Sequence, residues 1–280
     1  MAGITLAFSS AHALTVGLIL ILLGIASLVV GIAFSFTIPA LIGLGLVFWG
    51  IILTYIQSNE YVERKIFDST TTTLLTTLNE TLETLEYKGK AIYLPPKYLS
   101  DPETTKIYIP RQDIEALPTP DTIQKLAMQP SHRNAEGILI TPPAAKLVKL
   151  FETSIGTSFL NTSLLDLQQR LPKALIENLE VVTDFEIKLS VSKENEQPTK
   201  QNYTKSERVR VKFITTTYKN TFKQTAQLSA IHANIGCPLT SALASALAKT
   251  TGKPVIIESE QISEDGVRTQ VDYLILNEET

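Results

Sequence analysis

The chain of 280 residues has a single cysteine, Cys237, and only three histidines, His12, His132 and His232. One cysteine cannot form a disulfide within the chain, which excludes a disulfide framework. The histidines are too far apart in the sequence for the usual spacings of a zinc site. We therefore expect a fold without a disulfide and without a bound metal.

The sequence also lacks the common phosphate-binding loops, since neither G-x-x-x-x-G-K-[ST] nor G-x-G-x-x-G occurs. The formal net charge is −3, and acidic and basic residues are mixed along the chain. Nucleic-acid binding needs clustered Lys and Arg to neutralise phosphates, and this surplus is missing. We expect no cofactor and no nucleic-acid partner.

The longest stretch without charge runs from Leu14 to Gln57 and contains no Lys, Arg, Asp or Glu. An uncharged apolar run of about 18 or more residues is a candidate transmembrane helix, and this stretch is long enough for two. A break at residues 35–39 divides it. The sequence therefore predicts a transmembrane hairpin within residues 1–58, with helices at about 13–34 and 38–57.

A cleavable signal peptide is the alternative for the first apolar run. Such a peptide has a positively charged start and a short apolar core, of about 7–15 residues. Here no Lys or Arg precedes Arg64, and the first run is longer than that core. A retained membrane anchor is the better interpretation.

The orientation of the hairpin follows from the few positive charges beside it. Arg64 and Lys65 lie just beyond the second run, with Glu60 and Glu63 next to them, whereas the N-terminal flank has no Lys or Arg. Loops rich in Lys and Arg stay in the cytoplasm. We expect a protein of the cell membrane with both ends on the cytoplasmic side.

Glycines recur every seven residues in both predicted helices, at Gly17, Gly24 and Gly31 and at Gly43 and Gly50. Small residues at this spacing let helices approach closely in lipid. The glycines would serve a tight hairpin within one chain, or self-association and contacts with membrane-protein partners. The predicted helices contain no ionisable residue for an ion pathway, so the bilayer itself is the expected partner.

A juxtamembrane helix is predicted within residues 59–90. Leu75, Leu78, Leu82 and Leu85 follow the 3-4-3 spacing of one helix face. This stripe would pack on the chain's own domain or form a dimerising stalk.

Residues 91–141 combine a predicted β-hairpin with a proline-rich strap. AIYLPP and KIYIPR are two β-rich runs joined by a polar loop. Nine of the 14 prolines lie between Pro95 and Pro143, which argues against a regular helix or a central strand. We expect an extended strap over 111–137 with a short helix near 122–128. The stretch from Ala116 would be a connector or a docking peptide for a partner.

Residues 142–280 are predicted to form an α+β domain. Two amphipathic helices come first, and Pro172 should kink or split the second. Alternating patterns then predict strands, and we expect an antiparallel sheet with helices packed on one face. The predicted strands cover 181–191, 207–216, 254–262 and 268–276.

The last third of the chain contains a predicted helix of small residues, Gly236–Lys249, which opens at Cys237-Pro238. Gly252 should end this helix, and Asp265-Gly266 should turn between the last two strands.

This order of elements resembles the end of a vinyl-reductase-type domain, a small-molecule-binding relative of a vesicle-tethering subunit family. The resemblance covers about 45 residues, and that family often has further cysteines where this chain has Gln261 and Val271. It therefore implies a bound small molecule but no metal or redox role. The matching positions are Gly236, Cys237, Gly252, Pro254, Glu258, Gly266 and Tyr273. The hairpin combined with YLPP, IYIP and IGCP also resembles uncharacterised archaeal two-helix membrane proteins, which implies no activity.

Cys237 is the candidate functional residue. A cysteine at the start of a helix is most often a small buried residue, but a thiol there can also be reactive or carry a lipid. His232, five residues earlier, would be the base of a nucleophilic pair, which would still need an orienting group. Glu258 and Glu260 alternate along a strand and would share one face, either solvated or as paired carboxylates.

Three N-x-[ST] triplets begin at Asn79, Asn161 and Asn202, and they matter only if the domain lies outside the cell.

With no catalytic motif, we expect a membrane-anchored, non-enzymatic module for ligand sensing or protein interaction that faces the cytoplasm. The alternatives are a structural or scaffold subunit of a larger membrane complex, and a thiol-dependent hydrolase that would need an exposed Cys237.

Overall fold

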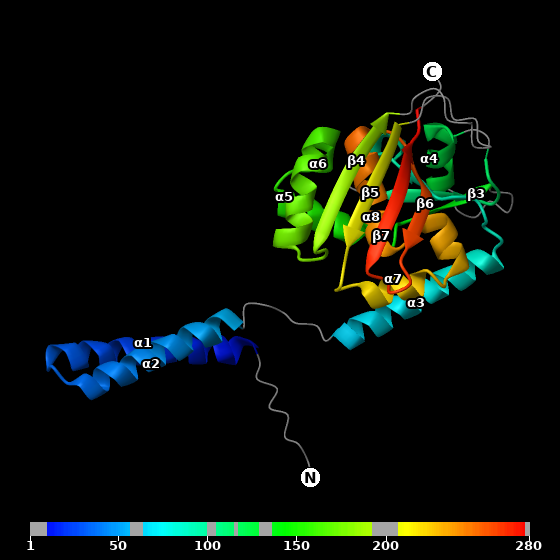
Figure 1. Cartoon of the computed structure of the whole chain (residues 1–280). Helices are drawn as coiled ribbons and strands as arrows, with labels where there is room; N and C mark the ends of the chain where they lie inside the picture. Colours follow the sequence, from blue (N-terminus) through cyan, green and yellow to red (C-terminus); the bar gives the residue numbers. More distant parts are fainter. Residues whose placement is uncertain are drawn as a thin grey trace, which may run out of the picture. The chain divides into compact units, whose positions relative to one another are not determined.

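A computed structural model of the chain describes residues 10–56, 64–99, 105–114, 117–128, 136–191 and 207–277. It contains two compact units, Met1–Arg64 and Lys65–Thr280, which are described separately below. Figure 1 shows the helices of the first unit in blue and the second unit in cyan to red.

The first unit is a helical hairpin of α1 (Ser10–Ala33) and α2 (Thr37–Ile56). Both helices are long and apolar enough to cross a membrane. The predicted pair of helices is thus confirmed, and its ends move by one to three residues.

The repeated glycines lie between the two helices of the hairpin. A Cβ atom on Gly24 would lie 2.8 Å from the carbonyl oxygen of Gly43, and one on Gly43 would lie 2.6 Å from that of Gly24. Gly17, Gly31 and Gly50 meet the opposite helix equally closely. The glycines are therefore buried in an intramolecular contact, and self-association through them would require the hairpin to open.

Helix α3 (Arg64–Thr84), which the sequence predicted within residues 59–90, packs on the rest of the second unit. Leu75 and Leu82 are buried, whereas Leu85 lies beyond the helix and is exposed. Asn79 Oδ1 accepts hydrogen bonds from the backbone N–H groups of Ala230 and Ile231, at 3.0 and 3.1 Å. The leucine stripe thus serves contacts within the chain.

The described residues of the second unit contain one antiparallel sheet of seven strands in the order β3-β2-β1-β6-β7-β5-β4. The four strands predicted in residues 142–280 are all present, and with the flanking helices they confirm the α+β class. The strands are β1 (Ile92–Leu94), β2 (Lys106–Pro110), β3 (Gly137–Ile140), β4 (Asp184–Val191), β5 (Glu207–Ile214), β6 (Val255–Ile262) and β7 (Arg268–Ile275).

The prediction kept residues 91–141 apart from this sheet, and there it was wrong. The β1–β2 hairpin forms as predicted, but β1 also pairs with β6, with Ile92 opposite Ile256. Strand β2 has neighbours on both sides despite the density of prolines. It can do so because Pro110 is the last residue of the strand, where a missing N–H is tolerated. Proline is tolerated at the start of α4 for a similar reason, since Pro120 is the first residue of that helix.

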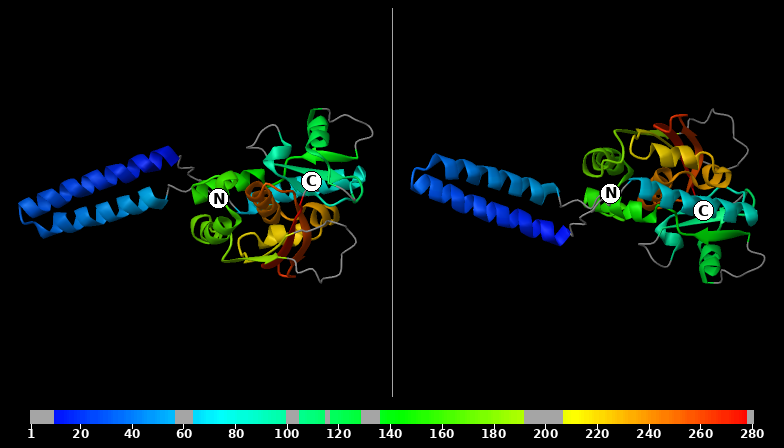
Figure 2. Two further views of the ribbon diagram at one scale, coloured as in Figure 1. Left: turned by 90° about the horizontal axis from the view of Figure 1, so that it is seen from above. Right: turned by 90° about the horizontal axis from the view of Figure 1, so that it is seen from below.

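Helices cover both faces of the sheet, and not one face as the sequence predicted. Most lie on the face that carries the larger core, whereas α4 covers β1, β2 and β6 on the opposite face through the buried Ile123. Figure 2 shows α4 beside β3 at the edge of the sheet, apart from α8. The helical segments are α4 (Pro120–Met128), α5 (Ala145–Ile155), η2 (Phe159–Asn161), α6 (Leu164–Lys173), η3 (Ala174–Asn178), α7 (Lys219–Thr225), η4 (Ile231–Ile235) and α8 (Pro238–Thr251), with the short η1 (Pro96–Tyr98) after β1.

The second amphipathic helix departs from α geometry where expected. Pro172 lies inside α6, and the chain passes from α to π geometry at Ala174. Ser163 caps the start of α6 by a reciprocal pair of hydrogen bonds with Asp166.

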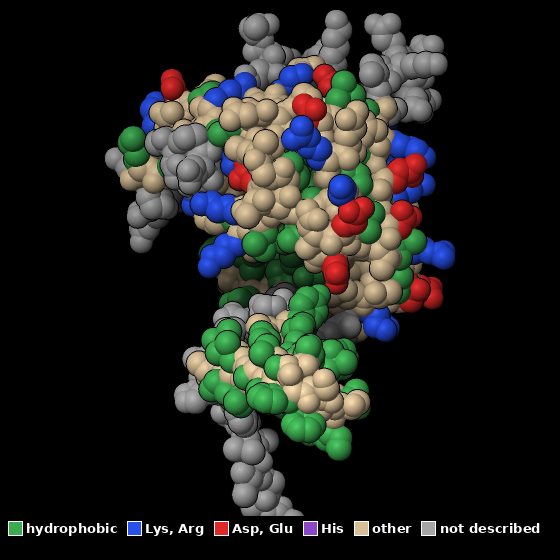
Figure 3. Space-filling view, turned by 90° about the vertical axis from the view of Figure 1, so that its left-hand side faces the viewer, with side chains coloured by type: hydrophobic (Ala, Val, Ile, Leu, Met, Phe, Trp, Pro, Cys, Tyr) green, Lys and Arg blue, Asp and Glu red, His purple; other side chains and the backbone are tan. Residues whose placement is uncertain are grey.

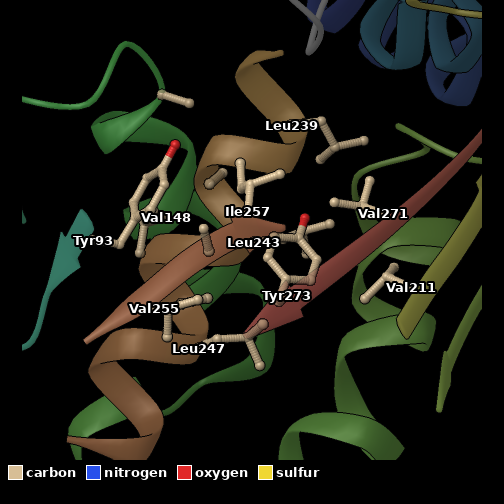
Figure 4. Packing of buried hydrophobic residues seen from close by; sticks show 14 of the residues in the cluster. Tyr93, Val148, Val211, Leu239, Leu243, Leu247, Val255, Ile257, Val271 and Tyr273 are labelled. Atoms are coloured by element: carbon tan, nitrogen blue, oxygen red, sulfur yellow. The ribbon is translucent and has the colours of Figure 1, made fainter. Parts of the chain in front are cut away.

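Helix α8 lies at the centre of the core, and almost every one of its residues is buried. In Figure 4 its leucines point toward side chains of the sheet. The helix ends at Gly252, which has the left-handed φ of 66° predicted for this position. The residues that form this contact are Leu239, Leu243 and Leu247 of α8 with Tyr93, Val255, Ile257, Val271 and Tyr273 of the sheet.

Candidate functional site

The elbow between η4 and α8 presents Cys237 to the sheet. η4 ends at Gly236, whose φ of 76° is in the region that favours glycine, and Cys237-Pro238 then starts α8. A Cβ atom on Gly236 would lie 2.8 Å from Ile257 Cδ1, so the glycine is also needed for close approach to β6.

A β-bulge in β6 turns Glu260 toward this elbow. Ile257 lies opposite Tyr273, but Ser259 lies opposite Asp272, which leaves Glu258 as the extra residue. A bulge shifts the alternation of side chains between the two faces. Glu260 therefore lies opposite the buried Val271 on the core face.

The carboxylate of Glu260 binds the elbow through both oxygens. Its Oε1 lies 2.9 Å from Cys237 Sγ, and its Oε2 lies 3.0 Å from His232 Nδ1. The backbone N–H of Cys237 lies 3.3 Å from each oxygen. A carboxylate accepts hydrogen bonds, so the thiol and the imidazole Nδ1 are the donors. The Glu260 side chain is only 1% exposed, and it occupies the anion-favouring start of α8.

Cys237 is consequently held as a thiol. It is fully buried, and burial raises the pKa of the Cys237 thiol well above its ordinary value, with the charge of Glu260 adding to the effect. A cysteine nucleophile needs the thiolate form. The arrangement places the carboxylate between thiol and imidazole, whereas a nucleophilic triad needs the imidazole beside the thiol.

His232 is the part of the cluster that reaches solvent. Its side chain is 31% exposed. The hydrogen bond to Glu260 raises the pKa of His232, while partial burial acts in the opposite direction. The imidazole is thus the solvent-facing member of the His232–Glu260 pair. When it is protonated, an ion pair is added to the hydrogen bond.

Two buried tyrosines fix the inner side of the elbow. The Tyr93 hydroxyl donates to the carbonyl oxygen of Ile235 at 2.6 Å, and the Tyr273 hydroxyl donates to that of Thr240 at 3.0 Å. Burial raises the pKa of both hydroxyls, so both remain protonated donors. Tyr273 is one of the positions matched in the tail resemblance, and here it positions α8.

Glu258 lies away from this cluster, and the expectation that it shares a face with Glu260 was wrong because of the bulge. Its carboxylate pairs with Arg208 at 2.9 Å, while its carbonyl oxygen accepts a hydrogen bond from Lys90 Nζ at 2.6 Å. Asp272 forms a separate ion pair with Arg210 on the same side of the sheet.

The other candidate residues do not join the cluster. His132, Asn202 and the side chain of His12 lie outside the described residues. Asn79 is buried, so its amide is not accessible in this fold, whereas Asn161 is exposed. Among the described residues, no group of three His, Cys, Asp or Glu side chains could hold a metal ion.

A second buried charged contact had no signal in the sequence. Lys249 of α8 donates to Glu152 of α5 at 2.8 Å, and Glu152 also accepts from Ser158 Oγ and the Phe159 N–H. Burial alone would raise the pKa of Glu152, but these hydrogen bonds outweigh it and lower that pKa. The contact attaches the outer helices to α8 and lies in a different part of the core.

The chain was compared with known proteins and protein families. No curated protein and no solved structure matches the chain. A family model described as a domain of unknown function, DUF7982, matches residues 10–274, which include both helices of the hairpin and the sheet up to the last residue but one of β7. Because this match covers far more than half of the sequence, the chain belongs to the DUF7982 family.

Proposed function

We propose that the chain is a membrane-anchored, non-enzymatic protein-interaction module whose α+β domain faces the cytoplasm. The observation that carries the proposal is the hairpin, whose two helices bury their glycines against each other and turn large apolar side chains outward. In water such a surface would be a strongly destabilising apolar patch. In a bilayer it matches the surrounding lipid.

The two units differ in their surface chemistry. In Figure 3 hydrophobic side chains dominate the described surface of the hairpin, whereas Lys, Arg, Asp and Glu are spread over the domain. The apolar side chains that α1 exposes include Leu18, Ile19, Leu22, Leu23 and Val29, and those of α2 include Leu41, Ile42, Leu44, Phe48 and Ile51. The hairpin is suited to lipid and the domain to water.

The cytoplasmic orientation is inferred from the charges next to the hairpin. Arg64 and Lys65 follow α2 in the sequence, and no Lys or Arg precedes them. Since positive flanks stay on the cytoplasmic side, the domain that directly follows these two residues would lie on that side too.

The chemistry of the elbow supports a non-enzymatic role. The thiol of Cys237 is buried and protonated, and both oxygens of Glu260 are engaged in hydrogen bonds. Only the outer edge of His232 reaches solvent. These groups hold β6, η4 and α8 together, which is a structural task.

Protein interaction is favoured over small-molecule sensing because of the packing around α8. The leucines of this helix contact the sheet directly, and the polar side chain of Lys249 is used in the ion pair with Glu152. The helical segments α5, η2 and α6, in contrast, each expose one leucine. These are Leu150 on α5, Leu160 on η2 and Leu165 on α6. Exposed apolar side chains are suitable contacts for another protein.

The second candidate is a scaffold subunit of a larger membrane complex, which would use the same exposed side chains permanently. To separate the two, the full chain is purified from membranes in mild detergent and its native mass is measured. A module that binds partners transiently should run as a monomer or dimer. A stable complex with other chains in fixed proportion would replace the proposal with the scaffold.

A further inference from the structure

The turn at the tip of the hairpin is closed by hydrogen bonds within α1. Ser35 has a left-handed φ of 55°, and its N–H donates to Ile32 O at 3.3 Å. The N–H of Phe36 donates to Gly31 O at 2.8 Å, which completes a Schellman motif. The N–H of Phe34 donates to Val30 O at 3.1 Å. The three amide donors of this turn therefore need no water.

Apart from Ser35 and Thr37, the side chains of residues 34–38 at the turn are apolar, and all five are exposed. Phe34 is 67% exposed, Phe36 is 59% exposed and Ile38 is 74% exposed. The two rings stack on each other with their centroids 6.3 Å apart. Large rings left in water at the tip of a loop lose the free energy that burial would give, about 25 cal/mol per Å².

Two further polar groups next to the turn are satisfied within the hairpin or removed. The hydroxyl of Ser27 donates to the carbonyl oxygen of Pro39 at 2.8 Å, across the two helices. Pro39 itself has no N–H in the first turn of α2. Residues 14–57 contain no charged side chain that would hold the turn in water.

The length of the helices sets the depth of the turn. α2 has 20 residues, which corresponds to about 30 Å of helix, and the hydrocarbon core of a bilayer is about 30 Å thick. If the domain end of α2 lies at one surface, the turn reaches the opposite boundary between acyl chains and headgroups.

We propose that the turn formed by Phe34, Ser35 and Phe36, together with Ile38, is a lipid-binding tip that lies in the far headgroup–acyl boundary and not in water. This inference rests on the proposed function, because it assumes that the hairpin spans a bilayer. Closed amides and stacked rings suit that boundary, where the remaining carbonyl oxygens still find headgroups and interfacial water.

The single tryptophan of the chain, Trp49, makes a direct test possible. The full-length protein is reconstituted in phosphatidylcholine vesicles, with bromine either near the headgroup end or deep in the acyl chains. The wild type reports on Trp49 in α2. Two variants, W49F/F36W and W49F/F34W, move the only indole to the tip at two neighbouring positions.

The indole of either tip variant should be quenched most by bromine near the headgroups. Its quenching by aqueous iodide should be several-fold weaker than that of free N-acetyltryptophanamide. Strong iodide quenching of both tip variants, with Trp49 of the wild type quenched by deep bromine, would overturn the tip inference and leave the anchor intact. If no brominated lipid quenches Trp49, the membrane anchor itself is contradicted.

Discussion

Glu258 and Glu260 are separated by one residue, yet they point to opposite faces of the sheet. Glu258 pairs with Arg208 on the outer face, and Glu260 binds His232 and Cys237 on the core face. The bulge between Ile257 and Ser259 produces this arrangement. It gives one carboxylate a solvated ion pair and the other a buried structural role.

The two carboxylates form a matched pair for mutation. Replacing Glu260 by Gln removes an acceptor from the Cys237 thiol or from His232 and buries an amide group without suitable partners. We expect E260Q to lower the free energy of unfolding by about 1–3 kcal/mol. The control, E258Q, breaks a partly exposed ion pair and should cost about 1 kcal/mol or less. Thermal or urea unfolding of the full chain in detergent measures both, and equal losses would contradict the assignment.

The stability of the domain should depend on the protonation of His232. Its pKa is raised in the folded state above the ordinary value of 6.5 by the hydrogen bond to Glu260. A raised pKa means that the folded state binds the proton more tightly than the unfolded state does. The stabilisation by protonated His232 is therefore complete below pH 6.5 and disappears as the pH rises through the folded-state pKa. Urea midpoints between about pH 5 and pH 9 should therefore fall more steeply with rising pH for the wild type than for H232Q. Parallel curves for the two proteins would argue against the ion pair.

The thiol of Cys237 should be inert in the folded protein. Because it is buried and its pKa is raised, N-ethylmaleimide at neutral pH should leave it unmodified. In denaturant the same sample should take up one equivalent, since the chain has one cysteine. Mass spectrometry distinguishes the two states. Full modification of the folded protein would revive the thiol-dependent alternative.

The glycine contact in the hairpin can be tested against a glycine that faces outward. A Cβ atom on Gly24 would lie 2.7 Å from Val47 Cγ2 and 2.8 Å from Gly43 O, whereas one on Gly45 would meet nothing within 4 Å. We expect G24A to loosen the hairpin by about 1–3 kcal/mol and G45A to leave it unchanged. Hydrogen exchange of the α1 and α2 amides in micelles reports the difference. Equal exchange in both variants would mean that the helices are not packed through Gly24.

Much of the architecture was accessible from the sequence because local signals were strong. The uncharged run predicted the two apolar helices, and alternation of apolar and polar residues predicted β4 and β5. Two β-rich runs around the Asp265-Gly266 turn predicted β6 and β7. Gly252 and Gly266 both have the positive φ values that the predicted helix end and turn require. These features depend on neighbours in the chain, so a sequence pattern is sufficient to find them.

The features that depended on distant partners could not be predicted in the same way. The pairing of β1 with β6 joins residues more than 150 positions apart, and no periodicity indicates it. The bulge at Glu258 is a matter of register with β7, so the alternation of Glu258 and Glu260 suggested the wrong face.

The candidate site was found only in part for the same reason. The five-residue spacing of His232 and Cys237 indicated a pair, but Glu260, which lies between them in space, is 23 residues further along than Cys237. In the sequence this carboxylate was one of two on a strand face, either solvated or paired with Glu258. Without a third group in place, neither the thiol chemistry nor the structural role could be assigned from spacing alone.

The proposed role of the hairpin as a membrane anchor underlies the proposed function, and alkaline extraction tests this role directly. Membranes from cells that express the full chain are treated with carbonate, and a flotation gradient separates bilayer-embedded protein from aggregates. Both helices have the length and hydropathy of a membrane span, so the protein should float with the lipid after carbonate and be released only by detergent. Recovery of most of the protein in the carbonate supernatant would contradict the account.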